Sequence, residues 1–173
     1  VQGDVGSGKT LVALFACLAA IESGAQAALL APTEILARQH HATLLKLAEG
    51  LDVRIALLTG RDKGKVREVL LADLAAGRIH LLVGTHAIFQ EAVDYHDLGL
   101  VVVDEQHRFG VAQRLMLAAK GRTPPHVLAM TATPIPRSLA LTRFGEMDQS
   151  MIDERPPGRQ PIETRVMGPE RLE

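Results

Sequence analysis

A glycine-rich segment near the start of the chain has the residue types and spacing that bind phosphate. It follows the pattern G-x-x-x-x-G-K-T, and an Ala-rich apolar stretch comes directly after it. Glycines let the backbone wrap around a phosphate with its N–H groups pointing inward, and the start of a helix adds partial positive charge. A chance glycine turn before an Ala-rich helix is the simpler alternative, but it leaves the four matched positions unexplained.

We expect the whole loop to contact the phosphates of a nucleotide. Lys9 would reach the β- and γ-phosphates, and the Thr10 hydroxyl would bind Mg²⁺. The candidate nucleotide-binding residues are Gly3, Asp4, Val5, Gly6, Ser7, Gly8, Lys9 and Thr10.

An acidic pair about a hundred residues further on could complete a reaction centre. Asp104 and Glu105 directly follow the apolar run 100–103, and the carboxyl ends of buried strands are where α/β sheets bind ligands. We expect Asp104 to hold Mg²⁺, directly or through water, and Glu105 to polarise the attacking water. A solvated acidic turn is the alternative for this pair alone. Together with Lys9, the two acids indicate hydrolysis of a nucleoside triphosphate.

The elements that must position these residues follow from a regular alternation along the chain. Five continuous apolar runs are typical of strands buried on both faces of a parallel sheet: 27–30, 53–58, 79–83, 100–103 and 127–130. Helical segments lie among them, each followed by a glycine that can end a helix: 9–23, 34–49, 64–76 and 111–120. Strands and helices in alternation predict a doubly wound α/β layer structure.

Composition limits the remaining possibilities. The 173 residues suit one domain, and 19 basic against 20 acidic residues give a net charge of -1. This charge argues against a strongly basic coat for nucleic acid, although a local basic groove is still possible. The single Cys17 excludes a disulfide scaffold. No apolar run approaches the roughly 20 residues of a membrane span, so we expect a soluble intracellular protein.

Four segments resemble, in order, the motifs of superfamily 2 helicases and translocases. Residues 31–34 (Ala-Pro-Thr-Glu) and 83–86 (Val-Gly-Thr-His) are similar to the two motifs that contact nucleic acid in that superfamily. Residues 104–107 (Asp-Glu-Gln-His) are similar to its acidic box. Residues 130–134 (Met-Thr-Ala-Thr-Pro) are similar to the motif that couples the ATP site to the strand-binding face.

Longer stretches resemble the RecG family of branched-DNA helicases. The likeness covers residues 84–90, 104–111 and 131–137, and it extends to 152–154 and 156–159. The bacterial transcription-repair coupling translocase shares the His-Arg-Phe-Gly-Val and Thr-Ala-Thr-Pro-Ile-Pro-Arg segments. It more often carries Glu where this chain has Gln106, and it lacks the Pro-Pro-Gly-Arg linker. RecG is therefore the favoured resemblance.

The resemblance implies a three-layer, RecA-like P-loop NTPase domain with a mainly parallel sheet. It also implies an ATP- and Mg²⁺-dependent motor that remodels branched double-stranded DNA, such as forks and Holliday junctions, for repair and recombination in the bacterial cytoplasm. Residues 1–155 would form the first motor domain, with its first strand truncated, and 156–173 a linker and the start of a second. That second domain would supply arginine fingers, and a wedge domain would split the DNA. This chain alone should therefore hydrolyse ATP very poorly.

Further site residues come from the same resemblance. Gln106 and His107 would complete the catalytic set, and His107 would bridge the acidic box to Thr131 and Thr133. A coupling segment of Thr131, Ala132 and Thr133 would then link the nucleotide to the DNA face. A satisfied core histidine is the alternative for His107.

Small hydroxyls and loop residues after successive strands predict a ledge that contacts the DNA backbone without reading its sequence. Its candidate members are Pro32, Thr33, Thr59, Gly60, Thr85 and His86. Each of these alone could equally be a helix cap or a turn. A basic run follows, comprising Arg61, Lys63, Lys65 and Arg67, for which a solvated helix start is as good an interpretation.

Two other classes of function are weaker. A small-molecule P-loop kinase would share the phosphate loop but has no reason to carry the acidic box and the Thr-Ala-Thr segment in this order. An inert scaffold does not explain an intact set of Lys9, Asp104 and Glu105. The adjacent His40 and His41 would diverge on a helix, so we predict no zinc site there.

Overall fold

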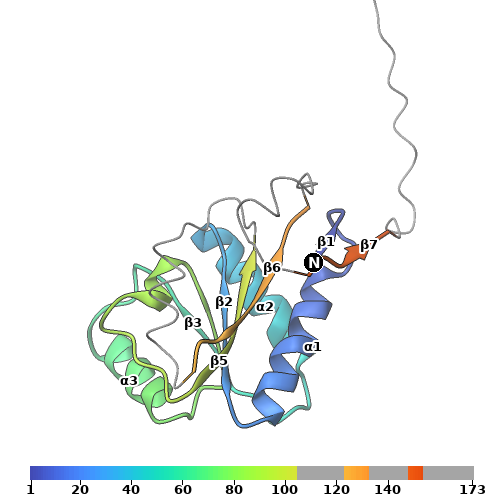
Figure 1. The fold of residues 1–173 in the computed structure, drawn as a ribbon. Coiled ribbons are helices and arrows are strands. Elements are labelled where there is room, and N and C mark those ends of the chain that lie inside the picture. Colours follow the sequence, from blue (N-terminus) through green and yellow to red (C-terminus); the bar gives the residue numbers. More distant parts are fainter. Residues whose placement is uncertain (105–122, 133–147, 154–173) are drawn as a thin grey trace, which may run out of the picture.

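The computed structural model describes residues 1–104, 123–132 and 148–153 (Figure 1). Its elements, in chain order, are β1 (Gln2–Gly3), α1 (Lys9–Glu22), β2 (Gln26–Leu30), α2 (Glu34–Leu47), β3 (Ile55–Leu58), α3 (Gly64–Ala75), β4 (Leu81–Gly84), η1 (His86–Phe89), β5 (Leu98–Asp104), β6 (His126–Met130) and β7 (Met151–Ile152). All five predicted strands and three of the predicted helices are confirmed. The fourth predicted helix, 111–120, lies outside the described residues.

The sheet is parallel throughout the described pairings. Five strands have the order β3-β4-β2-β5-β6. Beyond β6 lies β1, because Gln2 bridges to Thr131 in parallel, and β1 then pairs with β7. The loops that follow β2, β3, β4, β5 and β6 therefore leave one edge of the sheet, where α/β proteins bind their ligands.

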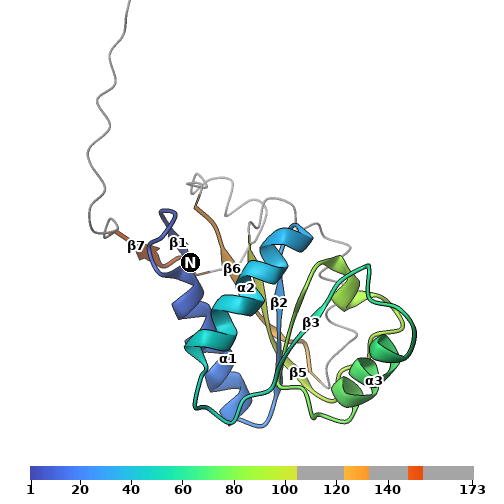
Figure 2. The same ribbon diagram turned by 180° about the vertical axis from the view of Figure 1, so that it is seen from behind.

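Helices cover both faces of the sheet, which makes three layers. In Figure 2, α1 and α2 lie in front of the sheet. They pack against every second strand residue, as in Ala27, Leu29 and Val102. The intervening strand residues pack with Leu74 of α3 and with Ile88 and Phe89 on the opposite face. Because strand side chains alternate between faces, burial on both sides explains why the strands are continuous apolar runs.

The predicted helix ends are close to those observed. Gly24 and Gly77 have φ values of 88° and 74°, a left-handed conformation that glycine adopts without steric cost. The helices end at Glu22, Leu47 and Ala75, one or two residues before the predicted ends. Within the described ranges, no helix has the length and apolarity needed to cross a lipid bilayer.

Candidate functional site

The glycine-rich loop joins β1 to α1 and folds tightly over the start of the helix. Gly8 is the N-cap of α1 and has a φ of 91°, so a left-handed residue leads directly into the helix. A Cβ atom added at Gly3 would lie 2.5 Å from Ser7 Oγ, which shows how closely the two ends of the loop approach. The loop therefore has the compact form predicted from its glycines.

Polar groups inside this loop suit a phosphate. Lys9 Nζ donates hydrogen bonds to the carbonyl oxygens of Gly3 and Asp4, both at 2.7 Å. The buried Ser7 Oγ has no hydrogen-bond partner among the described residues. An ammonium group has three donors, and an unpaired buried hydroxyl is costly unless a ligand or water satisfies it. These residues thus fit a bound phosphate, which could accept from both side chains.

Asp104 is the last residue of β5, and its carboxylate meets a side chain from α2. Its Oδ2 lies 2.7 Å from His40 Nε2, and the two side chains are only 13% and 14% exposed. An ionised carboxylate only accepts hydrogen bonds, so His40 is the donor. This contact is not among those predicted from the sequence.

The spacing of α2 contains a signal for His40. Ala37 and Leu44 are the fully buried residues of α2, and helical spacing puts position 40 on one side of the line between them and position 41 on the other. The two histidines do diverge, as predicted. His40 contacts Asp104, whereas burial lowers the pKa of His41, which makes a hydrogen bond with the backbone of Ile55.

Three neighbouring strands bring the loop, Thr131 and Asp104 together. Asp104 pairs with Met130 across β5 and β6. The next residue, Thr131, donates its N–H to the Val1 carbonyl (3.1 Å) and accepts from the Gly3 N–H (3.2 Å). Two strand spacings, about 10 Å, therefore separate the backbones of Asp104 and the phosphate loop. Ala132 is described just beyond Thr131, whereas Glu105, Gln106, His107 and Thr133 lie outside the described residues.

The other half of the same edge carries the candidate ledge. Thr33 is exposed and caps α2, its Oγ1 accepting from the Leu36 N–H at 3.3 Å. Gly60 and His86 are exposed after β3 and β4, while Pro32 is half-buried and Thr85 is buried. Because β3, β4 and β2 are adjacent, the loops that follow them lie side by side.

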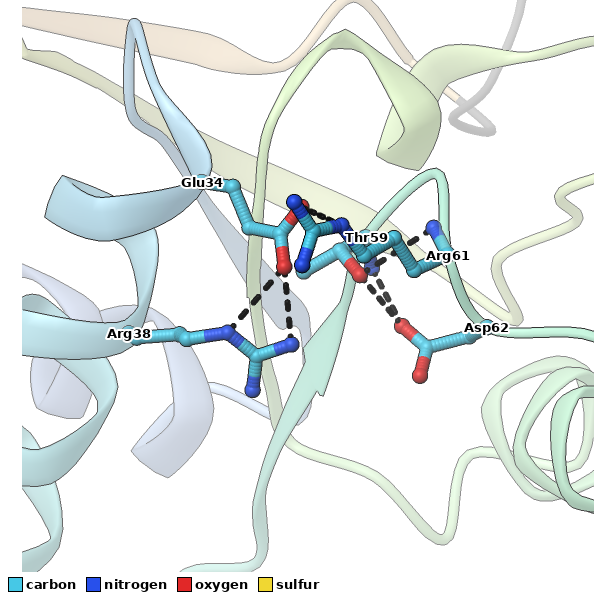
Figure 3. Close-up of polar contacts among 5 residues, drawn as sticks. All are labelled: Glu34, Arg38, Thr59, Arg61 and Asp62. Atoms are coloured by element: carbon cyan, nitrogen blue, oxygen red, sulfur yellow. Dashed lines mark hydrogen bonds and ion pairs between the residues drawn. The ribbon is translucent and has the colours of Figure 1, made fainter.

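Thr59 differs from the other ledge candidates. It is fully buried, and both its N–H (2.6 Å) and its hydroxyl (2.9 Å) donate to Asp62 Oδ2 (Figure 3). Its hydroxyl thus stabilises the turn after β3 and does not reach the surface. At this position only the backbone around Gly60 is available to a ligand.

Beside Thr33, one carboxylate holds two guanidinium groups (Figure 3). Glu34 accepts from Arg38 at 2.8 Å, and its other oxygen lies 3.2 Å from Arg61 Nε. The Arg61 side chain is 83% exposed, so solvent screens this pair. Asp62, held at Thr59, is a second carboxylate in this cluster, so two guanidinium groups face two carboxylates. Lys63 and Lys65 are also exposed, and Arg67 donates to Gln90.

Comparisons with known proteins agree on one family. The model of the DEAD/DEAH box helicase family matches residues 1–142. Proteins described as ATP-dependent DNA helicase RecG are 59% identical in Synechocystis sp., over 96% of this chain and 20% of the relative. They are 62% identical in Bacillus subtilis, over 95% of this chain and 24% of the relative. The chain thus spans about a fifth to a quarter of these relatives.

Solved structures share the fold. The structure of RecG bound to a three-way DNA junction is 44% identical, with a TM-score of 0.77, over 92% of this chain and 21% of that one. The helicase domain of Pyrococcus furiosus Hef is 22% identical, with a TM-score of 0.67, over 87% of this chain and 33% of that one, and it supports the fold alone.

Proposed function

Because the chain belongs to the DEAD/DEAH box helicase family, we propose that it is the ATP-binding motor domain of a helicase that remodels branched DNA. The likeness to RecG helicases, one of them solved with a three-way DNA junction, supports this substrate class. Replication forks and Holliday junctions in repair and recombination, in the bacterial cytoplasm, are the proposed setting. A second motor domain and a wedge domain of the same polypeptide are the proposed partners.

The observation that carries the proposal is the placement of the phosphate loop and Asp104 on one sheet edge, joined through Thr131. A triphosphate bound in the loop would extend toward this carboxylate. Lys9 would exchange the carbonyl oxygens of Gly3 and Asp4 for oxygens of the β- and γ-phosphates. The buried Ser7 hydroxyl would gain the partner it lacks among the described residues.

Thr10 and Asp104 would hold the Mg²⁺ that accompanies ATP. When bound, Mg²⁺ neutralises charge that develops on the phosphate oxygens. Glu105, next to Asp104 in the sequence, would orient and polarise the attacking water, with Gln106 and His107 as its neighbours. Thr131, Ala132 and Thr133 would couple this site to the DNA face, since Thr131 is bonded directly to the loop strand.

The ledge would contact the phosphates of DNA. Thr33, Gly60 and His86 are the exposed candidates after three adjacent strands, and Arg38 and Arg61 place guanidinium groups beside them. Pro32 and Thr85 shape the loops, and Thr59 holds its turn through Asp62. Backbone N–H groups, hydroxyls and arginines bind phosphates without reading bases.

The test is ATP hydrolysis by the full-length protein with and without a three-way DNA junction. We expect the junction to stimulate hydrolysis. We expect Lys9→Ala to abolish it, and Lys46→Ala, at an exposed position on α2, to leave it unchanged. Hydrolysis that ignores DNA but responds to a small phosphate acceptor would contradict the proposal and favour a kinase.

A further inference from the structure

Helix α2 runs from the ledge to the part of the sheet edge that carries Asp104. α2 begins at its cap Thr33, on the ledge, and presents His40 to Asp104 on the nucleotide half. Seven residues of α-helix separate these two positions, a rise of about 10 Å. A displacement of the start of α2 therefore moves the partner of Asp104 with it.

The hydrogen bond from His40 can hold the Asp104 carboxylate in one orientation. His40 Nε2 and Asp104 Oδ2 are 2.7 Å apart, and both side chains are largely shielded from water. With Oδ2 bonded to His40, Oδ1 would be the oxygen left for a metal ion. Partners of this kind fix the orientation of metal ligands and are worth about 10–100-fold in metal affinity or activity.

Attachment of α2 to the sheet does not require this hydrogen bond. Ala37 and Leu44 already anchor the helix, since both are fully buried in the cluster formed with β2, β4 and β5. The hydrogen bond of His40 to Asp104, the last residue of β5, can therefore serve the site. Its role differs from that of the adjacent His41, which contacts the backbone of Ile55.

We propose that His40 is a positioning residue that orients Asp104 for Mg²⁺ and makes the Mg²⁺ site respond to DNA bound at the start of α2. The inference rests on the proposed function. It adds to it a physical connection between the two ligands that runs through one rigid helix. By linkage, DNA then changes the affinity for Mg²⁺-nucleotide by the same factor by which Mg²⁺-nucleotide changes the affinity for DNA.

The test is equilibrium binding of a fluorescent, non-hydrolysable ATP analogue to the full-length protein. Binding is measured at increasing Mg²⁺ concentration, with and without a three-way DNA junction. For His40→Ala we expect half-maximal binding to need about tenfold more Mg²⁺, and the effect of DNA on nucleotide affinity to disappear.

Three further variants test whether loss of the His40 hydrogen bond causes these effects. His40→Gln keeps a donor at a reach similar to that of the imidazole Nε2, so it should behave as the wild type. His40→Asn is too short to reach Asp104 and should behave as His40→Ala, which keeps the test valid if the alanine variant fails to fold. Gln39→Ala, at an exposed position on the same helix, should change nothing.

Each outcome decides between the two proposals. Wild-type Mg²⁺ dependence and DNA response in folded His40→Ala or His40→Asn would overturn the role of His40 and leave the motor function intact. Equal losses in folded His40→Gln and His40→Asn would also overturn it, because a retained donor would then not matter. Wild-type protein that binds no nucleotide at any Mg²⁺ concentration would instead overturn the proposed function, and this inference with it.

Discussion

Two threonines with the same predicted role use their hydroxyls in opposite ways. Thr33 Oγ1 accepts a hydrogen bond from the Leu36 N–H, so its own O–H can still donate to a phosphate oxygen. The Thr59 O–H already donates to Asp62. A helix cap and a phosphate contact are therefore compatible at Thr33, whereas the turn at Thr59 uses the donor that a phosphate would need.

A pH dependence of stability follows from His41, the neighbour of His40. Burial lowers the pKa of His41 below its ordinary value, with a smaller repulsion from Arg38 in the same direction. The unfolded chain therefore binds a proton more readily than the folded one. The contribution of His41 to the free energy of unfolding is fully present above about pH 6.5, the pKa of histidine in the unfolded chain. This contribution is lost as pH falls through the lower pKa of the folded state.

We expect His41→Gln to reduce the loss of stability on acidification from about pH 7.5 to 5.5. Urea unfolding at several pH values, followed by circular dichroism, measures this slope. A variant with the same slope as the wild type over this range would show that His41 does not carry the effect.

At the scale of elements, Gly84 allows the end of β4 to lie close to the end of β3 and to η1. A Cβ atom added at Gly84 would overlap the Leu58 carbonyl oxygen and the Ile88 side chain. Backbone cannot move aside cheaply in a close-packed sheet. We expect Gly84→Ala to lower the free energy of unfolding by about 2 kcal/mol, measured by chemical denaturation.

Gly60→Ala is the matched control for this strand edge. It lies two residues beyond the end of the neighbouring strand β3, where an added Cβ meets nothing within 4 Å. Its stability should stay within about 0.5 kcal/mol of the wild type. Equal destabilisation by both substitutions would show that loss of glycine itself, rather than the overlap at Leu58, is responsible.

The elements found from the sequence are those whose signals are local. The apolar runs of β2, β4 and β5 are continuous because both faces are buried, and the phosphate loop is a contiguous segment. By contrast, β1 and β7 were not predicted as a pair, because each has two residues and they lie about 150 positions apart. The contacts of His40 with Asp104 and of Glu34 with Arg61 also depend on tertiary packing between distant segments.

Across the whole molecule, the sheet edge divides into two halves that meet between β2 and β5. The strands β5, β6 and β1 carry the candidate nucleotide residues, and β3, β4 and β2 carry the candidate ledge. The exposed Lys63 and Lys65 add positive charge on the ledge side, so a net charge of -1 for the chain is compatible with a local contact to DNA.

If the proposed function holds, a second motor domain would supply groups to the nucleotide site. Lys9 and Asp104 would hold the phosphates and Mg²⁺, and in related phosphoryl-transfer systems an arginine finger supplies about 10³–10⁵ in rate. The proposed second motor domain would contribute such groups. We therefore expect the 173-residue chain alone to bind an ATP analogue weakly and to hydrolyse ATP at least about a thousandfold more slowly than the full-length protein.

The measurement compares steady-state ATP hydrolysis by the two proteins, with and without a three-way DNA junction. A cooperative thermal transition of the 173-residue chain, followed by circular dichroism, is the control that it is folded. DNA should stimulate the full-length protein and leave the shorter chain unchanged, since a motor needs both domains to close on ATP. Turnover by the folded 173-residue chain within about tenfold of the full-length rate would mean that no second domain completes the site.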